Sequence, residues 1–173
     1  GCAVAGRLSE DPATSVAVLD AGGRNDNWVV TTPFALALMV AGNVNNWAFN
    51  AVPQKGLDGR IGYQPRGKGL GGSSAINAMV YIRGHRSDYD QWAALGNPGW
   101  SYADVLPYFH RMERSWRGTN NYGSSGPLPI TRNNTRYLLH DELMQAIASA
   151  GQPVTQDIHA GDEEGASFVE LTI

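Results

Sequence analysis

The sequence is poor in the residues that build disulfides and metal centres. Its 173 residues include one cysteine, Cys2, which excludes an internal disulfide and any CxxC metal site. The four histidines, His85, His110, His140 and His159, show no His-Glu-x-x-His or comparable ligand spacing. We therefore expect no metal site, and we expect these histidines to lie at the surface or to serve in packing.

Long hydrophobic runs and excess positive charge are also missing. The longest apolar run covers only residues 34–41, whereas a membrane-spanning helix needs roughly 20 residues. Lys and Arg number 13 against 16 Asp and Glu, and the net charge of −3 leaves no basic stripe for nucleic acid. We expect no membrane span and no nucleic-acid partner. No targeting segment is visible, although a chain that lacks its natural start could have lost one. The location that we expect is cytoplasmic.

Glycine is abundant, and one run of the chain concentrates it. The run covers residues 64–84 (QPRGKGLGGSSAINAMVYIRG) and contains Gly67, Gly69, Gly71 and Gly72. Without a Cβ, glycine lets the backbone turn sharply and approach a bulky ligand, which leaves successive N–H groups free to face an anion. Ser73 or Ser74 is expected to cap a helix that begins at Ala75, whose N-terminus would favour a phosphate. The alternative is a glycine-rich turn before a buried helix.

The first twenty residues have the pattern of the second half of a dinucleotide-binding βαβ unit. Val4 and Leu8 lie one helical turn apart, and residues 15–20 form an apolar run without alternation, as expected of a parallel strand covered on both faces. Gly1 would be the third glycine of the G-x-G-x-x-G fingerprint. Counted from Gly1, Asp20 then lies at the ~20-residue spacing at which a carboxylate binds the adenosine ribose. Many α/β proteins place an acid at a strand end, so this half-motif alone leaves a structural role open.

The glycine run and the segments after it resemble the signature of the glucose–methanol–choline (GMC) family of flavin-dependent oxidoreductases. Those segments are Tyr89-Asp90-Gln91-Trp92, Gly96-Asn97-Pro98-Gly99-Trp100-Ser101-Tyr102 and Leu106-Pro107-Tyr108-Phe109. The resemblance extends over essentially the whole chain. It implies FAD, oxidation of an alcohol and a much longer polypeptide, and it favours ribose binding by Asp20, where the family more often has glutamate.

The resemblance also implies a fold class and a domain division. We expect an α/β fold, with an incomplete, three-layer FAD-binding Rossmann-like domain followed by the beginning of an α+β substrate domain. Residues 1–114 would form the partial FAD-binding domain, with a lid or loop over the flavin between residues 22 and 64. Residues 115–126 would be a surface connection, and 127–173 would begin the substrate domain. Because the first strand and two glycines of the fingerprint are absent, we interpret the chain as an excerpt of a larger enzyme.

Hydrophobic spacing and turn residues predict further elements, namely helices over 34–41, 88–95, 101–113 and 139–150 and strands over 127–130 and 166–173. Ser101 and Asp104 form a capping box for the third of these helices, and Pro107 is expected to kink or interrupt it. Trp92 is expected to be buried in the second helix. Gly151 is expected to end the last one.

The chemistry that the resemblance implies requires a positioned flavin ring and a base. The base removes the hydroxyl proton while the carbon delivers hydride to the flavin N5. The residues implied along the isoalloxazine ring are Asn77, Ala78, Met79 and Val80, with Asn77 at the polar edge of the ring. The residues implied along the pyrophosphate and ribityl chain are Arg66, Gly67, Leu70, Gly71, Gly72 and Ser74. The family's base is a histidine near the far C-terminal end of the full polypeptide, so no catalytic residue is assigned here.

One departure from the family bears on how the cofactor is held. Choline-oxidase-like members bond FAD covalently to a histidine immediately before the asparagine, whereas this chain has Ile76 there. We therefore predict non-covalent FAD. The expected partners are a small alcohol, oxygen or a quinone or other carrier as electron acceptor, and the rest of the polypeptide.

Two other functions stay open at this point. A nicotinamide-dependent Rossmann dehydrogenase would share the N-terminal half-motif but gives no reason for the helix start at Gly71-Gly72-Ser73-Ser74. A non-catalytic flavin-binding or structural fragment is compatible with the missing base. A hydrolase is not expected, because no G-x-S-x-G elbow surrounds the two serines. The motifs Asn45-Asn46-Trp47 and Tyr81-Ile82-Arg83-Gly84 are most like those of the bacterial choline-dehydrogenase and alkyl-alcohol branch of the GMC family.

Overall fold

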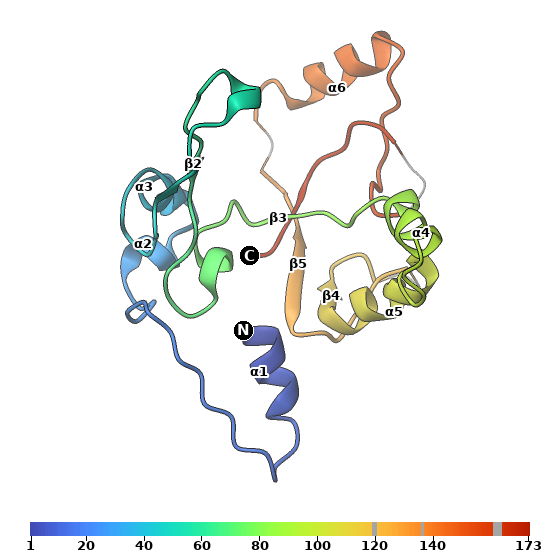
Figure 1. The fold of residues 1–173 in the computed structure, drawn as a ribbon. Coiled ribbons are helices and arrows are strands. Elements are labelled where there is room, and N and C mark those ends of the chain that lie inside the picture. The colour runs from blue at the N-terminus through green and yellow to red at the C-terminus, as the bar shows by residue number, and fades with distance from the viewer. Residues whose placement is uncertain (119–120, 136, 161–163) are drawn as a thin grey trace. The chain divides into compact units, whose positions relative to one another are not determined.

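The computed structural model describes residues 1–118, 121–135, 137–160 and 164–173 (Figure 1). It consists of two compact units, Gly1–Met79 and Val80–Ile173. The chain combines helices with strands of mixed orientation, which confirms the α/β class. Part of the connection expected over 115–126, at 119–120, lies outside the described residues. The domain division drawn from the sequence stays a prediction.

At the start of the first unit, the predicted helix is confirmed and the predicted strand is wrong. The helix expected from Val4 and Leu8 is α1 (Cys2–Leu8), with Gly1 at its N-cap position. The strand predicted over 15–20 does not form, since residues 14–20 have no regular structure and the Leu19 side chain is 98% exposed. An apolar run becomes a strand only when neighbouring strands pair with its backbone. No strand among the described residues does so.

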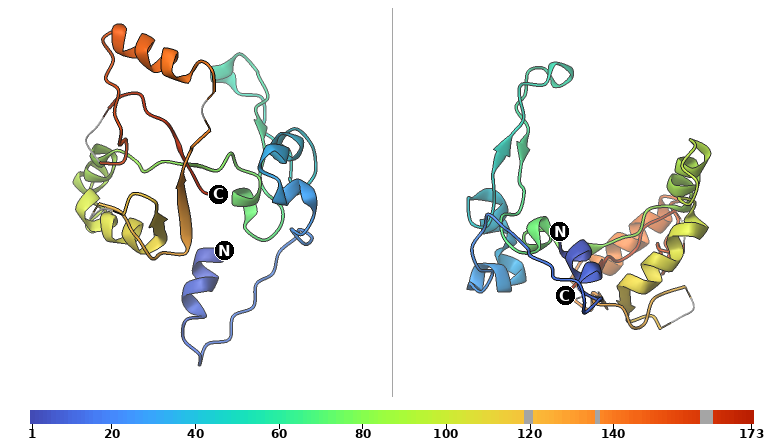
Figure 2. Two further views of the ribbon diagram at one scale, coloured as in Figure 1. Left: turned by 180° about the vertical axis from the view of Figure 1, so that it is seen from behind. Right: turned by 60° about the horizontal axis from the view of Figure 1, so that its bottom comes forward.

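The segment predicted to form the lid contains short helices and one hairpin. It begins with α2 (Trp28–Thr31), and the helix expected over 34–41 is present as the 3-10 turn η1 (Pro33–Ala35) followed by α3 (Leu36–Ala41). Strand β1 (Phe49–Asn50) then pairs antiparallel with β2 (Tyr63–Gln64), and the loop between them contains η2 (Lys55–Leu57). In Figure 2 this hairpin projects away from α2 and α3.

The glycine run folds differently from the prediction at its C-terminal end. The helix expected to begin at Ala75 is wrong, because a 3-10 turn, η3 (Gly72–Ala75), ends there. Neither serine caps a helix: the Ser74 hydroxyl donates to the Gly71 carbonyl at 2.7 Å, and the Ser73 hydroxyl accepts from the Gly67 amide at 3.1 Å. Both side chains therefore close the glycine loop on itself.

The second unit is built on a four-stranded sheet. Its strands are β3 (Val80–Tyr81), β4 (Glu113–Ser115), β5 (Leu128–Arg132) and β6 (Glu170–Leu171), in the order β3-β6-β5-β4. β4 and β5 pair in parallel, whereas β6 is antiparallel to both of its neighbours. The strands predicted over 127–130 and 166–173 are confirmed, the second in shortened form.

Three helices of the second unit follow the predicted pattern, namely α4 (Arg86–Ala94), α5 (Tyr102–Met112) and α6 (His140–Ser149). The capping box is confirmed, with the Ser101 and Asp104 side chains each accepting from the other residue's amide. Pro107 lies in the middle of α5 without interrupting it, although it removes one amide donor of the helix. Gly151 ends α6 with a φ of 79°. The predicted burial of Trp92 is wrong, because its side chain is 47% exposed.

Two searches of the described residues complete this account. None of the helices within them is long and apolar enough to cross a membrane. Within the same ranges, no group of three or more His, Cys, Asp or Glu side chains is placed to hold a metal ion.

Candidate functional site

The glycine run is packed so tightly that side chains are excluded at its turning points. A Cβ on Gly67 would lie 2.0 Å from the Gly72 carbonyl oxygen, which no real side chain could do. Gly71, at the N-cap of η3, has a φ of 91°, in the region that favours glycine. The run therefore forms a compact loop in which Gly69 is buried and the other glycines are half-buried.

The Asp20 segment lies directly against this loop. Asp20 Oδ1 accepts a hydrogen bond from the Gly22 amide at 2.7 Å, which makes a tight Asx turn. A Cβ on Gly22 would lie 2.3 Å from the Gly69 nitrogen, so the two backbones are in contact. The predicted ribose-binding carboxylate and the predicted phosphate-binding run, far apart in the sequence, thus lie in one neighbourhood of the first unit.

Cations and amide donors gather at the same loop. Within the described residues, the amide N–H groups of Leu70 and Gly71 have no hydrogen-bond acceptor. Among the residues that the structure describes, the exposed Arg66 guanidinium bonds the neighbouring Pro65 carbonyl, at 2.6 Å, and Gln64, at 3.4 Å. The Lys68 ammonium lies 4.5 Å from the centre of the Trp47 ring. Backbone donors beside cations make a surface that favours a phosphate.

The segment expected along the isoalloxazine ring forms a second tight turn. Asn77 Oδ1 accepts from the Met79 amide at 2.8 Å, and Met79 has a φ of 58°, which is uncommon for a residue with a side chain. This turn uses the oxygen of the Asn77 carboxamide and leaves its NH₂ donors exposed with Ala78. Ile76, just before it, is buried. Val80 begins β3 of the second unit.

Gly1 is a predicted residue for which the described residues show no hydrogen bond to this neighbourhood. Its carbonyl accepts from the Ala5 amide at 2.8 Å in the first turn of α1. Among the described residues, no hydrogen bond connects Gly1 to the glycine run. Its place in the dinucleotide fingerprint stays a prediction.

The second unit contains a buried charge cluster that the sequence analysis missed. Arg83 makes a bidentate ion pair with Glu113, at 2.8 Å from Nε to Oε1 and 2.6 Å from Nη2 to Oε2. The Tyr81 hydroxyl donates to Glu113 as well. Burial raises the pKa of Tyr81 well above its usual range, and the Glu113 carboxylate raises it further. Burial alone would lower the pKa of Arg83, but Glu113 and Tyr81 raise it, so the guanidinium stays protonated.

A neighbouring cluster is centred on Glu170. Its Oε1 accepts from Arg117 Nε at 2.6 Å and from Trp116 Nε1 at 2.9 Å, while Oε2 lies 3.5 Å from His159 Nε2. Burial would raise the pKa of Glu170, but His159 and Arg117 lower it. The Tyr122 hydroxyl donates to Asp157, and burial together with this carboxylate raises the Tyr122 pKa.

These clusters have a structural role. Their carboxylates are paired with cations or phenols, and Arg83, Glu113, His159 and Glu170 are almost completely buried. No local sequence pattern predicts these charge clusters, since Arg83 and Glu113 are separated by 30 positions. In the sequence analysis Arg83 appeared only as part of the family-like motif Tyr81-Ile82-Arg83-Gly84.

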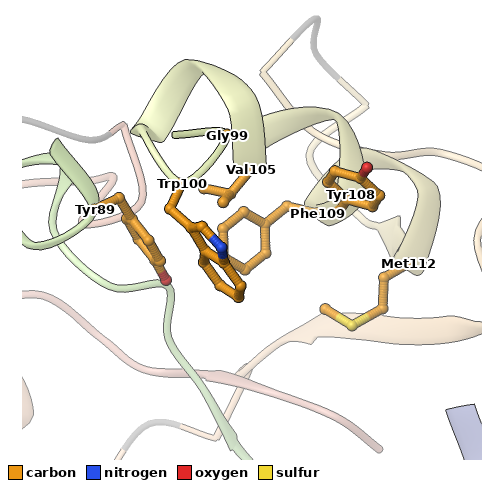
Figure 3. A pocket seen from close by; sticks show the side chains of 7 residues that line it. All are labelled: Tyr89, Gly99, Trp100, Val105, Tyr108, Phe109 and Met112. Atoms are coloured by element: carbon orange, nitrogen blue, oxygen red, sulfur yellow. The ribbon is translucent and has the colours of Figure 1, made fainter. Parts of the chain in front are cut away.

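An apolar pocket of about 510 Å³ lies on α4 and α5 (Figure 3). Its lining residues are Tyr89, Gly99, Trp100, Val105, Tyr108, Phe109 and Met112. None of the residues predicted to hold the cofactor belongs to it. With no cation or carboxylate in its lining, this pocket does not offer the groups that a phosphate or a hydride-transfer reaction needs.

The family is shown by comparison with known proteins. The family model described as GMC oxidoreductase matches residues 8–172, nearly the whole chain. The protein therefore belongs to the GMC oxidoreductase family, which confirms the resemblance read from its glycine run.

Two curated relatives are named as choline dehydrogenases. The chain is 41% identical over 181 residues to "Choline dehydrogenase, mitochondrial" of Homo sapiens, covering 100% of this chain and 30% of that protein. It is 44% identical over 173 residues to "Oxygen-dependent choline dehydrogenase" of Sinorhizobium medicae (strain WSM419), covering 99% of this chain and 32% of that protein. The chain thus spans about a third of the length of these relatives.

Solved structures agree with this assignment. Pyridoxine 4-oxidase from Mesorbium loti superposes with a TM-score of 0.89 at 32% identity, over 98% of this chain and 34% of that one. An FAD-dependent oxidoreductase from Chaetomium thermophilum superposes with a TM-score of 0.86 at 31% identity, over 100% of this chain and 32% of that one.

Proposed function

We propose that the protein is an FAD-dependent oxidoreductase that oxidises the CH–OH group of an alcohol. The observation that carries the proposal is the direct contact of the Asp20–Gly22 turn with the glycine loop at Gly69. A dinucleotide needs a ribose-binding carboxylate and a phosphate-binding backbone side by side. Membership of the GMC oxidoreductase family, and the FAD dependence named for the Chaetomium thermophilum protein, support the same conclusion.

The first unit contains the chemical groups that would hold the parts of FAD. Asp20 retains a carboxylate oxygen that can accept from the ribose hydroxyls, since its turn uses only Oδ1. Arg66 and the amides of Leu70 and Gly71 would bind the pyrophosphate, with Gly67, Gly72 and Ser74 forming the loop that presents them. Asn77 would donate from its NH₂ group to the polar edge of the ring system, beside Ala78 and Met79. Val80, the first residue of the second unit, stays a prediction from the resemblance. When bound, FAD accepts the hydride of the alcohol carbon.

The binding is proposed to be non-covalent. A covalent tether needs a nucleophilic side chain, and the position before Asn77 carries the buried aliphatic side chain of Ile76. Denaturing the purified full-length protein in acid should release all of its flavin into the supernatant. Yellow colour that stays with the precipitated chain would contradict this part of the proposal.

Substrate and acceptor are proposed as classes. Relatives named as acting on choline and on pyridoxine suggest a small alcohol substrate, and the two classes of acceptor are oxygen and a quinone or other carrier. The catalytic base is proposed to come from the rest of the polypeptide, because the relatives are about three times as long as this chain. A cytoplasmic location is likewise a proposal.

The absorption spectrum of the full-length protein tests the function. We expect flavin bands in the visible range, and we expect choline or other small alcohols to bleach them under anaerobic conditions. Visible bands that no alcohol reduces would favour a non-catalytic flavin-binding protein. A colourless protein that binds a nicotinamide cofactor would favour the Rossmann dehydrogenase and contradict the proposal.

A further inference from the structure

A buried asparagine anchors the beginning of the glycine loop. Asn46 is only 5% exposed, although its side chain is polar. Its Oδ1 accepts from the Arg66 amide at 2.9 Å and from the Ala48 amide at 3.0 Å. A carboxamide oxygen has two lone pairs, and both are used here. Asn46 therefore binds the backbone at the residue where the glycine loop starts.

The other half of the same carboxamide holds a different segment. Asn46 Nδ2 donates to the carbonyls of Met39 and Gly42, both at 3.0 Å, at the end of α3. The Tyr63 hydroxyl oxygen lies 2.8 Å from Nδ2, so the two N–H groups are shared among these three acceptors, and that hydroxyl donates to the Val40 carbonyl at 2.7 Å. One side chain thus joins the end of α3, strand β2 and the glycine loop.

Backbone hydrogen bonds extend this junction along the loop. The Trp47 amide donates to the Arg66 carbonyl at 2.8 Å, and the Lys68 amide donates to the Asn45 carbonyl at 2.7 Å. Asn46 and Gly67 form the antiparallel bridge between them. The place of residues 66–68 is therefore set by their pairing with residues 45–47, with the Asn46 side chain fixing the register.

The loop around Asn46 has a conformation that its own residues do not favour. Asn45 and Ala48 have φ angles of 53° and 51°, in the left-handed region. Such residues persist where the surrounding structure holds them, and they gather at functional sites. The hydrogen bonds of Asn46, which lies between them, supply that support.

The Asn45 side chain connects this junction to the segment that follows Asp20. Its Nδ2 donates to Asn25 Oδ1 at 2.8 Å, and Asn25 Nδ2 donates to the Leu70 carbonyl. Asn25 follows closely after the Asp20–Gly22 turn that touches Gly69. The two parts of the proposed cofactor site are therefore connected through asparagine side chains as well as through glycine contacts.

We propose that Asn46 is a positioning residue of the cofactor site, which sets the conformation of the pyrophosphate-binding loop from Arg66 to Gly72 without touching the cofactor. The inference rests on the proposed function. A loop that presents amide donors binds an anion well only when the donors are held in place before binding. Loss of Asn46 should therefore weaken the binding of the diphosphate part of FAD.

The test replaces Asn46 by alanine in the full-length protein and measures the affinity of the apoprotein for FAD and for ADP by calorimetry. ADP contains the adenine, ribose and diphosphate parts of FAD and lacks the flavin. Four hydrogen bonds or more are lost, so we expect both affinities to fall by about tenfold or more. The control is Asn50→Ala, an exposed asparagine of β1, which should change both affinities less than about twofold.

The measurement is made well below the unfolding temperature of each variant. A merely structural role would lower that temperature and leave the ADP affinity of the folded protein unchanged. Folded Asn46→Ala protein that binds ADP and FAD within twofold of wild type would therefore overturn the inference. Wild-type protein that binds neither ligand would overturn the proposed function instead.

A second variant covers the case in which Asn46→Ala does not fold. Tyr63→Phe removes the hydroxyl that accepts from Asn46 and bonds Val40, and it leaves the other bonds of Asn46 in place. We expect ADP affinity to fall by about threefold, as for loss of one hydrogen bond. An unchanged ADP affinity in Tyr63→Phe would also count against a positioning role.

Discussion

The two units of the chain differ in where their charged side chains lie. In the first unit the described ion pairs, Arg7 with Glu10 and Arg24 with Asp26, are exposed, and close contacts between glycine backbones determine the shape of the loop. In the second unit the Arg83 and Glu113 side chains are 1% and 0% exposed and bond each other in two places. The described ion pairs of the first unit therefore face water, whereas the charges of the second unit are buried against one another, with Arg83 Nη1 left without a hydrogen-bond partner among the described residues. Breaking a buried pair should cost far more stability than breaking an exposed one.

The largest effect should come from breaking the charge cluster. Glu113→Ala leaves the Arg83 guanidinium buried beside an unpartnered Tyr81 hydroxyl, and removal of one partner of a buried ion pair costs about 3–5 kcal/mol. Urea unfolding of the full-length protein should show this loss. Glu10→Ala removes one member of an exposed pair in the first unit, and a loss there above about 1 kcal/mol would contradict the contrast between the units.

The next effect concerns the glycine contacts of the first unit. In Gly67→Ala the new methyl group would meet the Gly72 carbonyl at 2.0 Å, so the loop must shift at a cost of about 1–3 kcal/mol. We expect FAD affinity, measured by flavin fluorescence, to fall by about tenfold to a hundredfold. Gly56→Ala is the matched control, because nothing lies within 4 Å of its Cβ position. Equal flavin affinity in the two variants would show that the loop tolerates a side chain.

A smaller effect is expected from the ribose-binding carboxylate. Asp20→Asn keeps an oxygen for the Gly22 amide but removes the charge that would strengthen hydrogen bonds from the ribose. FAD should bind about tenfold more weakly, and ADP should weaken by the same factor, as calorimetry can measure. Asp26→Asn, an exposed acid of the same segment, is the control. If riboflavin weakened equally, the carboxylate would not be acting on the ribose of the adenosine.

The smallest effect depends on pH and belongs to the second unit. The folded state lowers the pKa of Glu170 below its ordinary value of 4.5, so this group stabilises the fold above that pH. Its contribution should be lost as the pH falls from about 4.5 through the lower pKa of the folded state. Urea unfolding from pH 6 down to pH 3 should therefore show a steeper loss of stability for wild type than for Glu170→Gln. Parallel curves would show that Glu170 titrates alike in both states.

Patterns between near neighbours in the sequence determined much of this protein. Helices α1, α4, α5 and α6 follow from apolar residues one turn apart, and the Ser101 and Asp104 capping box follows from a spacing of three. The glycine run is itself a local pattern, and together with the segments after it, it was sufficient to indicate the GMC oxidoreductase family. Interactions between residues three or four positions apart depend little on the rest of the chain, so these features could be predicted.

Only the tertiary structure decided which distant residues meet. The run over 15–20 forms no strand, because a strand exists only through its partners. Gly22 touches Gly69, Asn46 binds the Arg66 amide, and Arg83 finds Glu113, although each pair is separated by at least 20 positions. Such pairs depend on the path of the whole backbone, and a polar side chain can be buried only where that path brings it a partner.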